Sequence, residues 1–231
     1  YEDVFYGFVL ARYNSNGTLD TGFGGTGIVK TSIGDYYSAA NSVAIQSDGK
    51  IVAVGSAGDS PTSNTDFAVV RYLTDGSLDT TFGSSNNGIL TTAIGAGSTP
   101  DVARAIAVQS DGKIIVGGYT GGSMALNDFA LVRYTSLGAL DSTFGTGGKV
   151  TTSFSSAGDA INSLVIQPDD KIIAAGIANQ YGSGNSSFAM ARYLTNGTLD
   201  STFGTSGKVT TAMQTSEARS VALQSDGKIL L

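Results

Sequence analysis

The stretch FAVVRYLTDGSLDTTFG, residues 67–83, decides the fold because it occurs in four versions along the chain. Its Arg-Tyr pair lies at residues 12, 71, 133 and 192, which gives intervals of 59, 62 and 59 residues. A second block, QSDGK at residues 46–50, returns at 109–113 and 224–228, and as QPDDK at 167–171. Recurrence at a fixed period indicates a tandem repeat. We therefore interpret residues 1–231 as one repeat domain, with units that begin near residues 8, 67, 129 and 188.

Each repeat contains four short runs rich in Val, Ile, Ala, Thr and Phe, separated by turn residues, and this pattern predicts strands rather than helices. An Asp-Gly pair such as Asp111-Gly112 joins the first two runs, since its glycine supplies the positive φ of a tight hairpin. Runs such as 114–116 are apolar on both faces, so each small sheet must be covered on both sides. The sequence therefore predicts an all-β protein, a β-propeller of four-stranded antiparallel blades.

The motif F-A-x-x-R-Y-x-x-D-G-S-L-D-x-x-F-G, followed by G-K-V-T-T and A-V-Q-S-D-G-K-I-I-V-G-G, resembles the delta-60 repeat family of bacterial proteins. The resemblance covers essentially the whole chain and implies a propeller, usually in a secreted or surface protein. The chain departs from the family pattern at Leu137 and at Pro168-Asp169-Asp170.

The four strands of a blade are labelled a to d, from the QSDGK hairpin (a and b) through FAxxRY (c) to GKVTT (d). The sequence begins in strand c, at residues 8–13, and stops inside strand b, at Leu231. We expect residues 8–13 to pair with 229–231, so that the terminal strands close a fourth blade. The alternative is a four-repeat portion of a larger propeller.

The composition excludes several kinds of chemistry. The chain has no His or Cys, which removes Ser-His-Asp and Cys-His catalysis, His or Cys zinc sites and disulfides. A net charge of −6 makes nucleic acid an unsuitable partner, because phosphates would not be neutralised. No run approaches the ~20 apolar residues that a membrane-spanning helix needs, so we expect no membrane insertion.

The spacing D-x-x-x-D in the opening stretch raises the question of a calcium loop. The corresponding pairs are Asn16/Asp20, Asp75/Asp79, Leu137/Asp141 and Asn196/Asp200. Leucine cannot bind calcium, so what recurs is the turn and its Leu-Asp pair, not a set of ligands. We expect structural turns at Asp20, Asp79, Asp141 and Asp200, with each carboxylate paired to a backbone N–H or to the strand-c arginine. We expect no metal or other cofactor, with calcium as the alternative.

The two ends of the blades differ in their variability. The a–b and c–d turns, which carry the repeated motifs, emerge on one face, and the b–c and d–a connections, which vary, emerge on the other. Tyrosines, acids and two arginines gather in the variable connections. We expect ligand-binding residues on this variable face at Tyr36, Tyr37, Asp101, Arg104, Tyr119, Asp159, Tyr181, Glu217 and Arg219.

Three functions fit these features. The first is a non-catalytic, extracellular binding or adhesion module, secreted or on a bacterial cell surface, with a glycan or cell-surface protein as ligand. The second is a structural unit that assembles with itself by strand addition. The third is a polysaccharide hydrolase or lyase that uses Asp101, Asp159 and Glu217 with Arg104 or Arg219. We favour binding, because spaced contacts from separate repeats do not converge on one bond.

Overall fold

The computed structural model describes residues 5–34, 37–58, 65–95, 99–121, 126–179, 186–212 and 216–231. Three complete antiparallel sheets of four strands follow one another along the chain, and a two-stranded sheet lies at each end. The prediction of an all-β propeller is confirmed. Within the part of the chain that the structure describes, no helix is long and apolar enough to cross a membrane.

The strands of each blade pair in sequence order. The first complete blade consists of β3 (Ser38–Ile45), β4 (Ile51–Gly58), β5 (Thr65–Tyr72) and β6 (Ile89–Thr92). The second consists of β7 (Asp101–Val108), β8 (Ile114–Thr120), β9 (Asp128–Tyr134) and β10 (Lys149–Thr152). The third consists of β11 (Ala160–Ile166), β12 (Ile172–Ala178), β13 (Ser187–Tyr193) and β14 (Lys208–Ala212).

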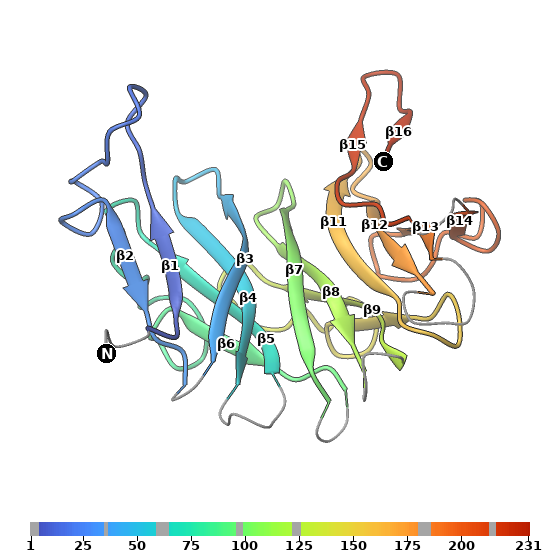
Figure 1. The fold of residues 1–231 in the computed structure, drawn as a ribbon, viewed down its shortest axis with the longest axis horizontal. Coiled ribbons are helices and arrows are strands. Elements are labelled where there is room, and N and C mark those ends of the chain that lie inside the picture. The colour runs from blue at the N-terminus through green and yellow to red at the C-terminus, as the bar shows by residue number, and fades with distance from the viewer. Residues whose placement is uncertain are drawn as a thin grey trace.

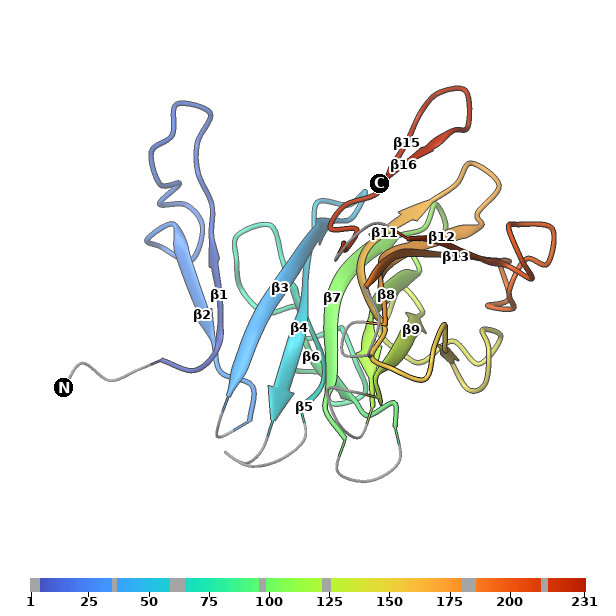
Figure 2. The ribbon, with the colours of Figure 1, turned by 45° about the vertical axis from the view of Figure 1, so that its right-hand side comes forward.

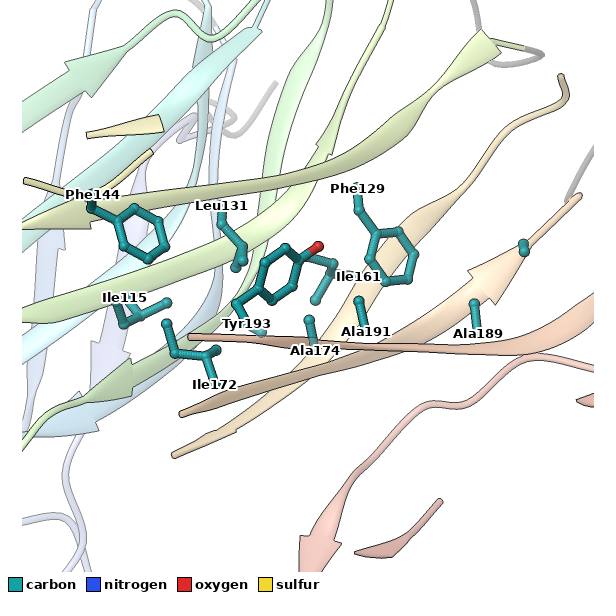
Figure 3. Close-up of a cluster of buried hydrophobic side chains, with 12 residues drawn as sticks. Ile115, Phe129, Leu131, Phe144, Ile161, Ile172, Ala174, Ala189, Ala191 and Tyr193 are labelled. Atoms are coloured by element: carbon teal, nitrogen blue, oxygen red, sulfur yellow. The ribbon is translucent and has the colours of Figure 1, made fainter. Parts of the chain in front are cut away.

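The core lies between neighbouring blades. Strands β4 and β12 are buried along their whole length, as apolarity on both faces predicts. Figure 3 shows one cluster, in which Tyr193 of the third blade packs among Leu131 and Phe129 of the second. The hydroxyl of Tyr193 donates to Thr152 at 2.8 Å, and the buried Tyr134 makes the same bond to Thr92 at 2.7 Å. Burial raises the pKa of both phenols, so both stay neutral. Each of these tyrosines joins its blade to the preceding blade through a buried hydrogen bond.

The terminal strands do not form the blade that the sequence predicts. At the N-terminal end β1 (Phe8–Ala11) pairs with β2 (Ile28–Thr31), and at the C-terminal end β15 (Ala222–Leu223) pairs with β16 (Ile229–Leu230). These are two separate sheets, so the expected pairing of residues 8–13 with 229–231 does not form. Figures 1 and 2 show the reason: the blades follow an open arc that does not turn far enough to bring β1 against β16.

The repeated Leu-Asp turn connects strands within a blade. Asp79 Oδ2 accepts a hydrogen bond from Arg71 Nε at 2.8 Å, and its Oδ1 accepts from the backbone and side chain of Thr81 at 3.0 and 2.6 Å. The ammonium group of Lys50, in the a–b hairpin, lies 3.5 Å from the same carboxylate. Burial opposes ionisation of Asp79, but these bonds and charges outweigh it and hold its pKa low. Asp141 and Asp200 have the same partners in their own blades.

The turn carboxylates are thus occupied by cations and hydroxyls of their own blade. The hydroxyl of Thr202 donates to Asp200 and, with the nearby Arg192 and Lys171, lowers the pKa of that carboxyl to about 2. Asp20 differs from the other three, because its side chain is 30% exposed where that of Asp79 is 3% exposed.

This contrast gives a matched pair of variants. We expect Asp79→Ala to lower the free energy of unfolding by about 3 kcal/mol, because it leaves the buried guanidinium of Arg71 without its counter-ion. Asp20→Ala removes the same side chain from an exposed pair and should cost about 1 kcal/mol or less. Urea denaturation of both variants measures the difference. Equal losses would mean that the turn alone, and not the buried ion pair, stabilises the blade.

Candidate binding site on the inner strands

The innermost strands of the three complete blades share a bulge at the same position. The register with the neighbouring strand shifts between residues 40 and 42 in β3, between 103 and 105 in β7, and between 161 and 163 in β11. The bulged residues are Asn41, Arg104 and Asn162. Because a β-bulge re-aims a side chain, the repeat places one polar group per blade on the inner side of the arc.

A glycine opposite each bulge makes room for it. A Cβ at Gly118 of β8 would lie 1.9 Å from the carbonyl oxygen of Val102, and Gly55 and Gly176 have the same contact in their own blades. In each blade a backbone carbonyl next to the bulge occupies the space that a side chain at the glycine position would need. The glycine therefore determines the local geometry.

The bulged residues connect neighbouring blades. Asn41 donates to the carbonyl of Ala103 at 2.8 Å, and Asn162 donates to that of Ala218 at 3.0 Å. Between them, Arg104 donates from NH1 to Asn162 Oδ1 at 2.8 Å. This chain of bonds crosses β3, β7 and β11, which lie side by side on the inner side of the arc (Figure 1). It fixes where the polar side chains of the inner strands stand relative to one another.

These strands and residues of their neighbours line an open polar hollow of about 870 Å³. The guanidinium of Arg104 lies 4.8 Å from the centre of the Tyr119 ring, and this contact holds both groups in place at its wall. Arg219 forms an ion pair with Glu217 at 3.0 Å, and its side chain is 82% exposed. Tyr37 lies at the rim and is also exposed. The hollow thus offers two guanidiniums, one carboxylate, two aromatic rings and the amides of the bulges.

Five of the nine predicted ligand-binding residues line this one hollow: Tyr37, Arg104, Tyr119, Glu217 and Arg219. They come from different repeats, yet the curvature of the arc brings them to a shared surface. Tyr36 and Tyr181 lie outside the described residues.

The other two, Asp101 and Asp159, are buried and do not face the hollow. Asp101 Oδ2 accepts from the backbone N–H groups of Ile94 and Gly95. Asp159 accepts from the N–H groups of Phe154 and Asn179 among others. Burial raises the pKa of Asp159 although these bonds oppose the rise. Both carboxylates therefore fasten the connection from strand d to strand a.

Sequence reasoning missed Asn41 and Asn162. The signal was present, because the bulged residue always precedes the Gln of the QSDGK block by five positions, and the fourth unit has Arg219 there. The strand-b glycine follows the Lys of that block by five positions in the first three hairpins. A polar residue and a glycine at fixed places in otherwise apolar strands predict a bulge.

Among the described residues, no group of three or more His, Cys, Asp or Glu side chains could hold a metal ion. The hollow instead presents the guanidiniums of Arg104 and Arg219, the carboxylate of Glu217 and the rings of Tyr37 and Tyr119.

Comparison with known proteins agrees with the architecture. A family model described as "Domain of unknown function (DUF5122) beta-propeller" matches residues 3–23, 46–82, 109–144 and 167–203, which together make up more than half of the chain. The chain therefore belongs to this family of β-propellers. A search of the curated proteins finds no significant match.

The glycine opposite the bulge can be tested directly. We expect Gly118→Ala to lower the free energy of unfolding by about 2–3 kcal/mol, since the new methyl group would overlap the backbone carbonyl of Val102. Gly22→Ala is the control, because a Cβ there meets only the Asp20 carboxylate at 3.2 Å. Thermal melting of both variants measures the effect. If Gly118→Ala melts like the parent, the bulge does not depend on the glycine.

Proposed function

We propose that this protein is a non-catalytic binding module and that the hollow on the inner strands takes a carboxylated glycan. The observation that carries the proposal is the convergence of Tyr37, Tyr119, Arg104 and Arg219 on one surface, although they come from different repeats. Tyrosine rings stack against sugar faces, and guanidiniums bind carboxylates in a planar, charge-assisted geometry. Asn41 and Asn162 add amides that suit sugar hydroxyls.

The carboxylates support binding over hydrolysis. Glycosidases need two carboxyl groups on either side of the scissile bond. Of the three acids that an enzyme could use, Asp101 and Asp159 are buried in backbone hydrogen bonds, and Glu217 is paired with Arg219. Glu217 is thus the one of the three that lines the hollow.

We also propose that the chain is of the delta-60 type and acts outside a bacterial cell, secreted or at the cell surface. The resemblance of its repeats and its cysteine-free, acidic, glycine-rich composition support this location. A cell-surface protein is the alternative ligand, and neither ligand requires a cofactor.

The test compares a uronic-acid oligosaccharide with a neutral oligosaccharide of the same length, by calorimetric titration. We expect the acidic glycan to bind more tightly, with an affinity that falls as salt increases. Arg219→Gln and Tyr119→Ala should each weaken binding about tenfold, the loss of roughly 1.4 kcal/mol. Tyr6→Ala is the control, because Tyr6 is exposed but does not line the hollow.

Two outcomes would contradict the proposal. Equal affinity for both glycans, unchanged by Arg219→Gln, would mean that the guanidiniums do not select the ligand. Turnover of the glycan that is abolished by Glu217→Gln, with the fold intact, would replace the binding module with an enzyme.

A further inference from the structure

Arg104 differs from the bulged residues of the other two complete blades in both its type and its neighbour. The first and third blades have Asn41 and Asn162 at the bulge. On strand b, the residue after the glycine that faces the bulge is Tyr119 in the second blade, where the other two blades have serine and isoleucine. An arginine and an aromatic ring therefore occur together in one blade, among repeats that otherwise match.

Two neutral groups hold the guanidinium of Arg104. Its NH1 donates to Asn162 Oδ1 at 2.8 Å, and its Cζ lies 4.8 Å from the centre of the Tyr119 ring. Within the part of the chain that the structure describes, no carboxylate forms a salt bridge with it. Arg219, by contrast, is already paired with Glu217. A partly buried guanidinium held only by neutral groups attracts an anion.

The amide of Asn162 has one orientation. Its Nδ2 donates to the carbonyl oxygen of Ala218 at 3.0 Å, while its Oδ1 accepts from Arg104. A flipped amide would place its NH₂ group against the guanidinium and its oxygen against the carbonyl, so both bonds would be lost. The amide of Asn162 therefore fixes where NH1 of Arg104 lies.

The hydrogen bond to Asn162 leaves one complete edge of the guanidinium. Nε and NH2 of Arg104 have no hydrogen-bond partner among the described residues, and both are accessible to solvent at the wall of the hollow. Their N–H groups point the same way in the guanidinium plane, as a fork that matches the two oxygens of a carboxylate. Because the ring of Tyr119 covers one face of the group, a ligand reaches the edge.

We propose that Arg104 selects the acidic ligand by binding one carboxylate side-on through Nε and NH2, and that Asn162 and Tyr119 are the positioning residues that present this edge. This rests on the proposed function, because the carboxylate is that of the glycan. The ring of Tyr119 then supports the guanidinium, and the exposed ring of Tyr37 is available to stack on a sugar.

Arg104→Lys tests the edge, because lysine keeps the charge and loses the planar fork. We expect the affinity for a uronic-acid oligosaccharide to fall about tenfold, while the affinity for a neutral oligosaccharide of the same length stays within about twofold of the parent's. Calorimetric titration measures both. An unchanged affinity of Arg104→Lys for the acidic oligosaccharide would overturn the side-on contact.

Asn162→Ala and Tyr119→Leu keep Arg104 and remove its supports. Each should lower the ratio of acidic to neutral affinity about fivefold, since a guanidinium that is no longer held must be ordered on binding. Tyr119→Phe keeps the ring and should keep the ratio of the parent.

Tyr193→Phe is the control for loosened blades. It removes the buried hydrogen bond to Thr152, between the second and third blades, and Tyr193 does not line the hollow. We expect the affinity ratio to stay as in the parent. If this variant lowers the ratio as much as Asn162→Ala does, Asn162 acts through the packing of the blades and not through Arg104.

Nuclear magnetic resonance of the guanidinium tests the site without a glycan. In isotope-labelled protein, the Nε–H signal of Arg104 is assigned by its loss in Arg104→Lys. We expect sodium acetate to shift this signal and sodium chloride at the same ionic strength to leave it in place, because acetate supplies the carboxylate alone. In Asn162→Ala without any ligand, the Nε–H proton should exchange with water faster than in the parent.

These measurements separate the two proposals. If acetate shifts the Arg104 signal but neither oligosaccharide binds, the proposed function fails and the carboxylate site at Arg104 stands. If the acidic oligosaccharide binds and the Arg104 signal moves with neither it nor acetate, the hollow binds the glycan through other groups and the role of Arg104 is wrong. Equal exchange of the Nε–H proton in the parent and in Asn162→Ala would overturn the positioning role of Asn162.

Discussion

The arginine of strand c is the interaction on which the rest of the structure depends, because it serves two blades at once. Arg133 is buried, and its Nε donates to Asp141 of its own blade at 2.9 Å while NH1 donates to the carbonyl of Thr195 in the next. Its guanidinium also lies 4.5 Å from the centre of the Phe144 ring. A charge buried without its partners would cost several kcal/mol, so this group holds both turns in a fixed position. Arg71 and Arg12 make the same connections one and two blades earlier, respectively.

This arrangement explains why one face of the molecule is repetitive and the other is not. The Arg, Asp and Lys of each unit are committed to contacts within and between blades, and the sequence around them recurs. The inner strands have a different constraint, a bulge and its opposing glycine. The bulged position requires only a residue that can reach the next blade, and Asn41, Arg104 and Asn162 all do so. That freedom lets the inner surface carry arginines beside tyrosines without loss of the fold.

Much of the fold can be predicted from the sequence, because the same pattern of strands and turns recurs four times and each copy supports the interpretation of the others. The strands, the Asp-Gly hairpins and the role of the Leu-Asp turn can all be predicted from residues such as Asp79 and Gly112. Closure could not be predicted, since complementary terminal strands do not determine how far each blade rotates from the last. The site was partly predictable. Arg104, Tyr119 and Arg219 belong to a surface that the variable connections indicate, but the burial of Asp101 and Asp159 depends on backbone N–H groups whose positions only the folded loop provides.

Hydrogen exchange on a conservative variant tests most directly whether the arginine joins neighbouring blades. Arg133→Lys keeps the charge but loses the planar group that reaches Asp141 and Thr195 together. We expect faster amide exchange in two places: in strand β9 and the turn that follows it in the second blade, and in residues 194–199 of the third blade. Faster exchange in the second blade alone, with 194–199 protected as in the parent, would contradict it.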